Sequence, residues 1–290
     1  RRGAVHWPKL GPIACVVDNT LPGEVKSVSL VEEADGWYVV ACCAAEVPAP
    51  APPPPTAPVL GIDRGVVNLL ADSAGRLTPH PRWGRAAEDT LARLQRKAAG
   101  QVRGSQGWHR TVRRIARLNL RVRRQREAVL HTESLRIARE VGAGRWGAVA
   151  VEALQLTAMT ASARGTVEEP GTRVAQKAGL NRAMLDGAHG RFEQLLTYKV
   201  TDAGGAVLRV DPAYSSQTCA ACGVVDARSR RSQAEFVCVA CGHTGNADVN
   251  AAQVLAQRDE MARVEAAGGA GAAGGAGQGK RPKKLRAVRK

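Results

Sequence analysis

Two Cys-x-x-Cys pairs, separated by fifteen residues, constrain this chain more than any other feature of its sequence. A glycine follows each pair, Gly223 or Gly242, and permits the tight turn that directs backbone amides at the thiolates. Two chelating pairs of thiolates suit one tetrahedral Zn²⁺, so we expect a zinc ribbon over residues 213–245. Four thiolates close the coordination shell, which predicts a structural role rather than a catalytic one. The expected ligands are Cys219, Cys222, Cys238 and Cys241.

The other cysteines and the charge indicate the setting and the partner. Cys15, Cys42 and Cys43 lie far from the two pairs, and the total of seven cysteines is odd, so a disulfide framework is not expected. The alternative to zinc binding is that the Cys-x-x-Cys pairs are buried structural cysteines or a redox pair. A formal charge of +16 favours a polyanionic partner, nucleic acid before anionic lipid.

Membrane insertion and secretion have no support in the sequence. No apolar run approaches the roughly 18 residues that cross a bilayer, and the first residues lack the apolar core of a signal peptide. We therefore expect a cytoplasmic protein with no membrane partner. Because the chain begins with Arg and its first residues read as the end of a module, we also expect an N-terminally truncated chain.

Composition divides the chain into segments. A hairpin signature over 24–44 predicts a small N-terminal β-module, and prolines mark the linker that follows it. Continuous apolar runs at 59–63 and 146–154 are typical of strands that are buried on both faces. The expected division is a partial β-barrel at 1–47, a linker at 48–58, a nuclease-like core at 59–212, the zinc ribbon at 213–245, a final helix at 246–264 and a disordered basic tail at 265–290.

A helical region at 85–141 carries the densest positive charge. Residues 90–126 contain twelve Lys and Arg and no acid, while Ile115, Leu118 and Val122 form an apolar stripe at helical spacing. The simplest alternative is a solvated charged face, but the absence of balancing acids favours phosphate binding. The residues expected to bind nucleic acid are Arg110, Arg113, Arg114, Arg117, Arg121 and Arg124.

Three acidic residues stand where acids are costly. Asp63 and Glu152 each fall within or at the end of an expected buried strand, and Asp248 opens the helix after the ribbon. Each has an ordinary explanation on its own: a turn cap, an ion-pair partner or a helix N-cap. Taken together, three hard oxygen donors would suit Mg²⁺, and two such ions can support phosphodiester hydrolysis.

In these motifs and their order, the chain resembles the TnpB (OrfB) family of transposon-encoded, RNA-guided DNA endonucleases. The matching segments are VLGIDRGVVNLL, VAVEALQLTAMT, QKAGLNRAMLDGAHGRFEQLLTYK, VDPAYSSQTCAACG and FVCVACGHTGNADVNAA. The resemblance implies an α/β fold, with an RNase H-like (RuvC) mixed sheet, flanking helices and an inserted zinc ribbon. It implies DNA and a guide RNA as partners, structural zinc, catalytic magnesium, and Asp63, Glu152 and Asp248 as the catalytic, metal-binding acids.

Two departures from the family pattern keep other functions open. Only the last hairpin of the family's N-terminal β-barrel is expected, so a catalytically silent nucleic-acid-binding remnant is the main alternative. A strand-transferring transposase would share the fold but needs an end-recognition domain that the sequence does not show. Arg64 also follows Asp63 where a small or apolar residue is expected, and it either lowers the pKa of Asp63 or faces solvent.

Overall fold

The computed structural model describes residues 2–16, 21, 23–46, 50–51, 54, 57–166 and 169–269. Most of the expected linker at 48–58 and residues 270–290 of the expected tail lie outside this part of the chain.

A five-stranded mixed sheet forms the centre of the protein. Its strands lie in the order β7-β6-β5-β8-β9, with β5 antiparallel to β6 and parallel to β8, and β8 parallel to β9. This arrangement of an antiparallel meander followed by parallel strands is the RNase H-like sheet that the sequence predicted. The strands are β5 (Val59–Asp63), β6 (Asn68–Asp72), β7 (Leu77–Pro79), β8 (Ala148–Glu152) and β9 (Ala206–Val210).

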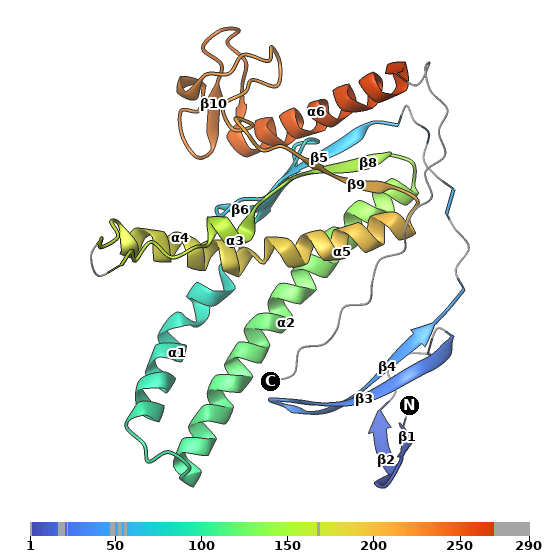
Figure 1. Cartoon of the computed structure of the whole chain (residues 1–290), viewed down its shortest axis with the longest axis vertical. Helices are drawn as coiled ribbons and strands as arrows, with labels where there is room; N and C mark the ends of the chain where they lie inside the picture. The colour runs from blue at the N-terminus through green and yellow to red at the C-terminus, as the bar shows by residue number, and fades with distance from the viewer. Residues whose placement is uncertain are drawn as a thin grey trace.

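Helices cover both faces of the sheet (Figure 1). On one face α2 (Gln106–Gly142) and α5 (His189–Asp202) pack together, and their apolar side chains join those of β5 and β8 in the main core. The opposite face is covered by α6 (Ala247–Gly269), which packs on β5. Every residue of β8 is buried because the strand is covered from both sides, which explains the continuous apolar run before its final residue, Glu152.

The close contact between α6 and β5 depends on a glycine. A Cβ at Gly61 would overlap the carbonyl oxygen of Ala252 and come within 2.9 Å of the Ala256 nitrogen. With hydrogen at this position, the helix backbone can lie directly against the strand. This contact fixes the position of the first turn of α6 relative to the end of β5.

The predicted helical region is two helices, α1 (Trp83–Ala99) and α2, joined by a short turn, because Gly100 and Gly104 interrupt the pattern. The two helices extend away from the sheet side by side (Figure 1). Farther along the chain, α4 (Val174–Gly187) is separated from α5 by Ala188, which has a left-handed conformation with φ 48°.

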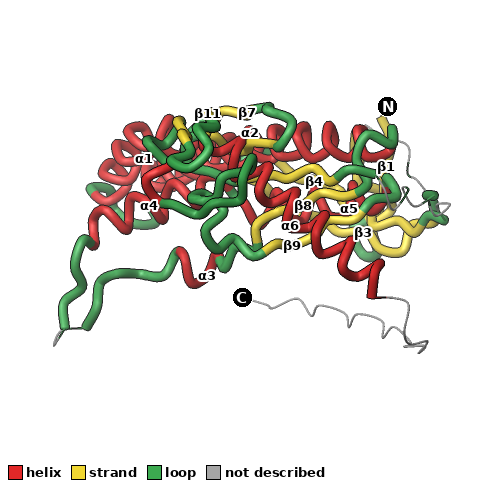
Figure 2. Tube along the Cα trace, turned by 90° about the horizontal axis from the view of Figure 1, so that it is seen from above, coloured by secondary structure: helices red, strands yellow, loops and turns green. Residues whose placement is uncertain are grey.

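Between the acid-bearing strand β8 and α4, the chain forms the short helix α3 (Leu156–Met159) and then a long loop. In Figure 2 this loop extends away from the body of the molecule. The final helix, α6, runs past its expected end at Val264 to Gly269, because the alanines before the terminal glycine pair favour helix. Residues 265–269, expected to begin the disordered tail, are therefore helical. None of the described helices is long and apolar enough to cross a membrane.

The N-terminal β-module contains one hairpin more than expected. The first hairpin pairs β1 (Arg2–Trp7) with β2 (Gly11–Val16), and the predicted one pairs β3 (Glu24–Glu33) with β4 (Gly36–Ala44). Each is a separate two-stranded sheet. The sequence missed the first hairpin because its strands are short and interrupted by Pro12, which weakens the strand pattern.

Candidate active site and zinc ribbon

Asp63 and Glu152 are the last residues of two neighbouring parallel strands. The register pairs Ile62 with Val151, so the two acids follow in equivalent positions at the same edge of the sheet. Carboxyl ends of parallel strands meet at one edge, which explains why two acids far apart in sequence are neighbours here. Asp63 is half-buried and Glu152 is buried.

Asp248 approaches the same edge from the helix that covers the sheet. It lies in the first turn of α6, four residues before Ala252, and therefore on the same face of the helix. Ala252 contacts β5 at Gly61, and Gly61 and Asp63 share one face of the strand because side chains alternate. The Gly61 contact thus directs Asp248, which is buried, toward Asp63.

Electrostatics show that the three acids influence one another. Burial, together with the negative charges of Glu152 and Asp248, raises the pKa of Asp63 to about 8. Burial also raises the pKa of Glu152, against the opposing effect of the Arg64 guanidinium. A bound cation would relieve both the burial cost and the repulsion between the carboxylates.

Neighbouring side chains hold the acids in place. Asn68 Nδ2 donates to Asp248 Oδ2 at 2.9 Å, and Arg230 Nη2 donates to Asp248 Oδ1 at 3.1 Å. Ser215 Oγ donates to Glu152 Oε1 at 3.4 Å. The sequence alone did not indicate these three residues, because nothing in their local pattern distinguishes a polar group of a site from an ordinary loop residue.

Arg64 is fully buried and does not face solvent, which decides between the two alternatives for this residue. Its guanidinium donates to the main-chain oxygen of Glu152 and, at 2.8 Å, to the Glu193 carboxylate. The positive charge of Arg64 lowers the pKa of Asp63, although burial and the other acids outweigh it. Arg64 therefore ties the end of β5 to the end of β8 and to α5 from behind the acids.

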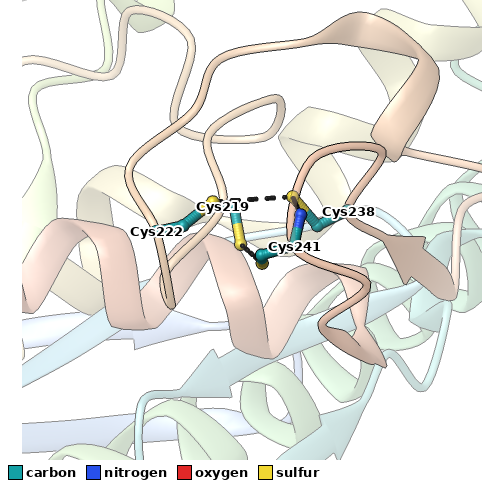
Figure 3. A group of neighbouring side chains, drawn as sticks. All are labelled: Cys219, Cys222, Cys238 and Cys241. Atoms are coloured by element: carbon teal, nitrogen blue, oxygen red, sulfur yellow. Dashed lines mark hydrogen bonds between the residues drawn. The ribbon is translucent and has the colours of Figure 1, made fainter.

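The four cysteines form the tightest cluster of potential metal ligands among the described residues. Their sulfur atoms all lie within 4.8 Å of one another, and the three carboxylates form no group this tight. Figure 3 shows Cys219 facing Cys241, with sulfurs 3.7 Å apart, and Cys222 facing Cys238, with sulfurs 3.6 Å apart. This geometry could hold a zinc ion.

A backbone amide favours the thiolate at Cys238, whereas the pKa values of Cys219, through burial, and of Cys222 are raised without a metal. Gly223 and Gly242 have left-handed φ values of 76° and 75°, as the turn after each pair requires. The Cys241 amide donates to the Cys238 sulfur at 3.5 Å, and this bond is the main cause that lowers the pKa of Cys238 to about 6. The thiolate is the form that binds a metal.

The ribbon is joined to the core at the first turns of α6. It includes the short helix η1 (Ala227–Ser229) and the hairpin β10 (Glu235–Val237) and β11 (Thr244–Asn246). Asn250, on α6, donates to the Thr218 carbonyl at 2.7 Å and accepts from the Ala220 amide at 3.0 Å. Both bonds hold the ribbon next to the helix turn that carries Asp248.

The arginines predicted to bind nucleic acid lie on α2, but not all of them are free. Arg124 pairs with Asp35 at 2.5 Å and also donates to Tyr38, and Arg117 donates to the Ala34 carbonyl at 3.2 Å. Arg110 bonds to Gln106 on its own helix. Among the described residues, Arg113, Arg114 and Arg121 have no hydrogen-bond or ion-pair partner, so the turn between β3 and β4 covers only part of the basic surface.

The RNase H-like sheet, with acids at the carboxyl ends of its strands and an inserted four-cysteine ribbon, defines a RuvC-like protein. Two family profiles match the chain: "Probable transposase" (OrfB, IS605 type) over residues 42–163 and "Cas12f1-like, TNB domain" over residues 189–255. These matches confirm the resemblance to the OrfB (TnpB) family that the motifs predicted.

Curated relatives agree with this assignment. An Escherichia coli (strain K12) protein, provisionally named the RNA-guided DNA endonuclease InsQ, is 35% identical over 249 residues, covering 86% of this chain and 60% of that protein. The CRISPR-associated endodeoxyribonuclease Cas12f1 of Sulfoacidibacillus thermotolerans is 32% identical over 162 residues, covering 56% of this chain and 34% of that protein. The chain thus spans less than two thirds of either relative.

Solved structures also resemble the chain. A Cas12f1–sgRNA–target DNA complex has a TM-score of 0.49 with 17% identity, covering 80% of this chain and 56% of that one. A second CRISPR–Cas12f ternary complex has a TM-score of 0.48 with 19% identity, covering 79% and 44%.

Proposed function

We propose that this protein is a magnesium-dependent DNA endonuclease directed by a guide RNA, with Asp63, Glu152 and Asp248 as its catalytic acids. One observation carries the proposal: acids from β5, β8 and α6 lie close enough together that burial, followed by the charges of Glu152 and Asp248, raises the pKa of Asp63 to about 8. A protein gains nothing in stability from such repulsion. Carboxylates held this close together are instead typical of a site that binds divalent cations.

The donor set fits magnesium. Mg²⁺ prefers hard oxygen ligands, and the site offers carboxylates on rigid elements. When bound, paired magnesium ions would lower the pKa of an attacking water and stabilise charge on the leaving oxygen. We infer that Asp63 and Asp248 would hold the ions from either side and that Glu152 would hold the second one.

The surrounding side chains have supporting roles in this proposal. Ser215 and Arg64 fix Glu152 through its carboxylate and its backbone, and Asn68 orients Asp248. Arg230 adds a positive charge beside Asp248, where it would attract the phosphate of a bound strand. The unpaired arginines of α2 would bind the sugar–phosphate backbone without reading its sequence.

A second candidate is a nucleic-acid-binding protein without nuclease activity. The observation that favours it is the occupation of Asp248, whose two carboxylate oxygens already accept hydrogen bonds from Asn68 and Arg230. If those bonds persist with magnesium present, the site stays closed to the cation.

Cleavage assays separate the two functions. The protein would be incubated with single-stranded and duplex DNA and Mg²⁺, with and without RNA transcribed from its own locus. We expect Mg²⁺-dependent cleavage that Asp63→Asn abolishes and Asp202→Asn, an exposed acid on α5, leaves intact. If the unmodified protein and both variants are equally inactive but still bind nucleic acid, the second candidate is favoured.

A further inference from the structure

An open cleft of about 1010 Å³ lies between α1 and α4, and its lining includes Val66, three residues after Asp63. We call it the α1–α4 cleft. Its lining combines apolar side chains, which we call the floor (Val66, Leu91, Ala183 and Leu185), with arginines, of which Arg82 and Arg85 matter here. We propose that this cleft binds an unpaired nucleotide of a nucleic-acid strand, with the base against the apolar floor and the phosphate on Arg82 and Arg85.

Charge is the first argument for an anionic ligand. Four arginines and two acids line the cleft, and both acids are already neutralised. Asp186 accepts from Arg126 at 2.6 Å and from the Gly84 amide at 3.0 Å, while Glu88 lies 3.7 Å from Arg182. Arg82 and Arg85 are both exposed, and neither guanidinium has a hydrogen-bond or ion-pair partner among the described residues. Two free cations therefore face the cleft.

The apolar floor is the second argument, because a bare phosphate would not need it. Leu185 is 63% exposed, which is costly for a large apolar side chain, and Leu91 and Ala183 continue the apolar surface. A planar base would cover this surface, and guanidinium groups can stack on its face. The ligand that matches both parts of the cleft carries an apolar face and an anion.

The size and position of the cleft favour a single strand over a duplex. Cavities of this volume accept small ligands rather than a double helix, and bases in a duplex have both faces stacked and unavailable. Val66 lines the cleft three residues after Asp63 and two before Asn68, which contacts Asp248. A strand seated there would pass close to the proposed catalytic acids.

This inference extends the proposed function, since it names a subsite for the strand, but binding can be measured without cleavage. Fluorescent single-stranded DNA, the same sequence as RNA, and a duplex would each be titrated with the protein without added magnesium. The test variant is Arg82→Gln/Arg85→Gln. The matched control is Lys9→Gln/Arg139→Gln, which removes the same charge from exposed residues that lie outside the basic segment 90–126 and do not line the cleft.

We expect the test variant to weaken single-strand binding about tenfold and to lower its salt dependence by about 0.7 in log–log slope, for one phosphate that is no longer neutralised. The control should change affinity by less than about threefold, and duplex binding should respond equally to both variants. The arm with the higher affinity, DNA or RNA, identifies the source of the nucleotide. Equal weakening of single-strand binding by both variants would overturn the inference.

Two further measurements test the base. Ala183→Trp would fill the floor without changing charge and should weaken single-strand binding as the arginine variant does. Single strands that carry 4-thiothymidine or 4-thiouridine should crosslink to residues 83–95 or 179–187 even if the tryptophan variant fails to fold. Crosslinks confined to other segments would contradict the inference. If the cleft variants weaken binding but the unmodified protein does not cleave DNA, the cleft inference stands and the proposed nuclease function fails. If the protein cleaves DNA but the cleft variants bind single strands with unchanged affinity, the nuclease function stands and the cleft inference fails.

Discussion

Arg230 lies between the two cysteine pairs and donates a 3.1 Å hydrogen bond to Asp248, the acid that begins the helix after the ribbon. The ribbon therefore does more than precede this acid in sequence, because it supplies one of its two hydrogen-bond donors. The side chains of the pair are 23% and 5% exposed, so the contact is largely screened from water. Four cysteines that fix the ribbon also fix Arg230.

Arg230→Gln should destabilise the metal-free protein by about 1 kcal/mol, because a buried carboxylate loses a charged partner. The positive charge of Arg230 also lowers the pKa of Asp63, so its loss should make that acid harder to ionise and weaken magnesium binding. Thermal melts with and without Mg²⁺ test both effects. Arg231→Gln, a change at the exposed neighbour, is the control and should leave both values unchanged.

Zinc content should follow the paired cysteines alone. We expect one zinc per chain and a large loss of zinc in Cys238→Ser, because removing one thiolate opens the four-ligand site. Cys42→Ser removes an exposed cysteine of β4 and should keep full zinc content. Metal analysis of the purified proteins gives the result directly, and an unchanged zinc content in Cys238→Ser would rule out this site.

Magnesium binding should strengthen as the pH rises toward 8. The pKa of Asp63 is raised from 3.8 to about 8, so the folded metal-free protein retains a proton that the unfolded chain loses, and its stability falls between those values as pH rises. Above the pKa of Asp63 in the folded protein, a cation can bind the carboxylate without first displacing that proton. Melting temperatures with Mg²⁺ should therefore increase more at about pH 9 than at about pH 6.

The same argument makes Asp63→Asn stabilising without metal at neutral or higher pH, where it removes a buried group that resists ionisation. This variant should also lose most of the gain from Mg²⁺. A melting temperature that rises equally with Mg²⁺ in both proteins would show that the cation binds elsewhere.

Gly61→Ala should cost about 1–3 kcal/mol or more, because its Cβ would overlap the Ala252 carbonyl and push α6 away from β5. The displacement would also separate Asp248 from Asp63. Gly179→Ala is the matched control: its Cβ would meet nothing within 4 Å, and alanine should stabilise α4 by up to about 1 kcal/mol. Chemical denaturation of both variants measures the difference.

Freeing the arginines of α2 should strengthen nucleic-acid binding. In the β3–β4 turn, Glu33 pairs with Arg123 at 2.6 Å and Asp35 pairs with Arg124 at 2.5 Å. We expect Glu33→Gln/Asp35→Asn to increase affinity for nucleic acid a few-fold and to steepen its salt dependence. Glu32→Gln/Glu46→Gln makes the same charge change at exposed acids without an ion pair, so equal affinities in the two variants would exclude specific competition by the turn.

Local patterns in the sequence determined the zinc ribbon, the buried strands and the basic helices. Cys-x-x-Cys spacing, continuous apolar runs and clustered arginines each act over a few turns of chain, and the family motifs added the RNase H-like fold. The helix breaks at Gly100–Gly104 and Ala188 were harder to place, because helical periodicity continues across them.

Only the tertiary structure decided how the three acids relate. Asp63 and Glu152 become neighbours through parallel pairing of β5 with β8, and Asp248 joins them because Gly61 lets α6 approach the sheet. Arg230, Asn68 and the buried position of Arg64 likewise depend on contacts between residues far apart in sequence. Pair interactions of this kind leave no local signature, since each partner is an ordinary polar residue until the fold brings it to the site.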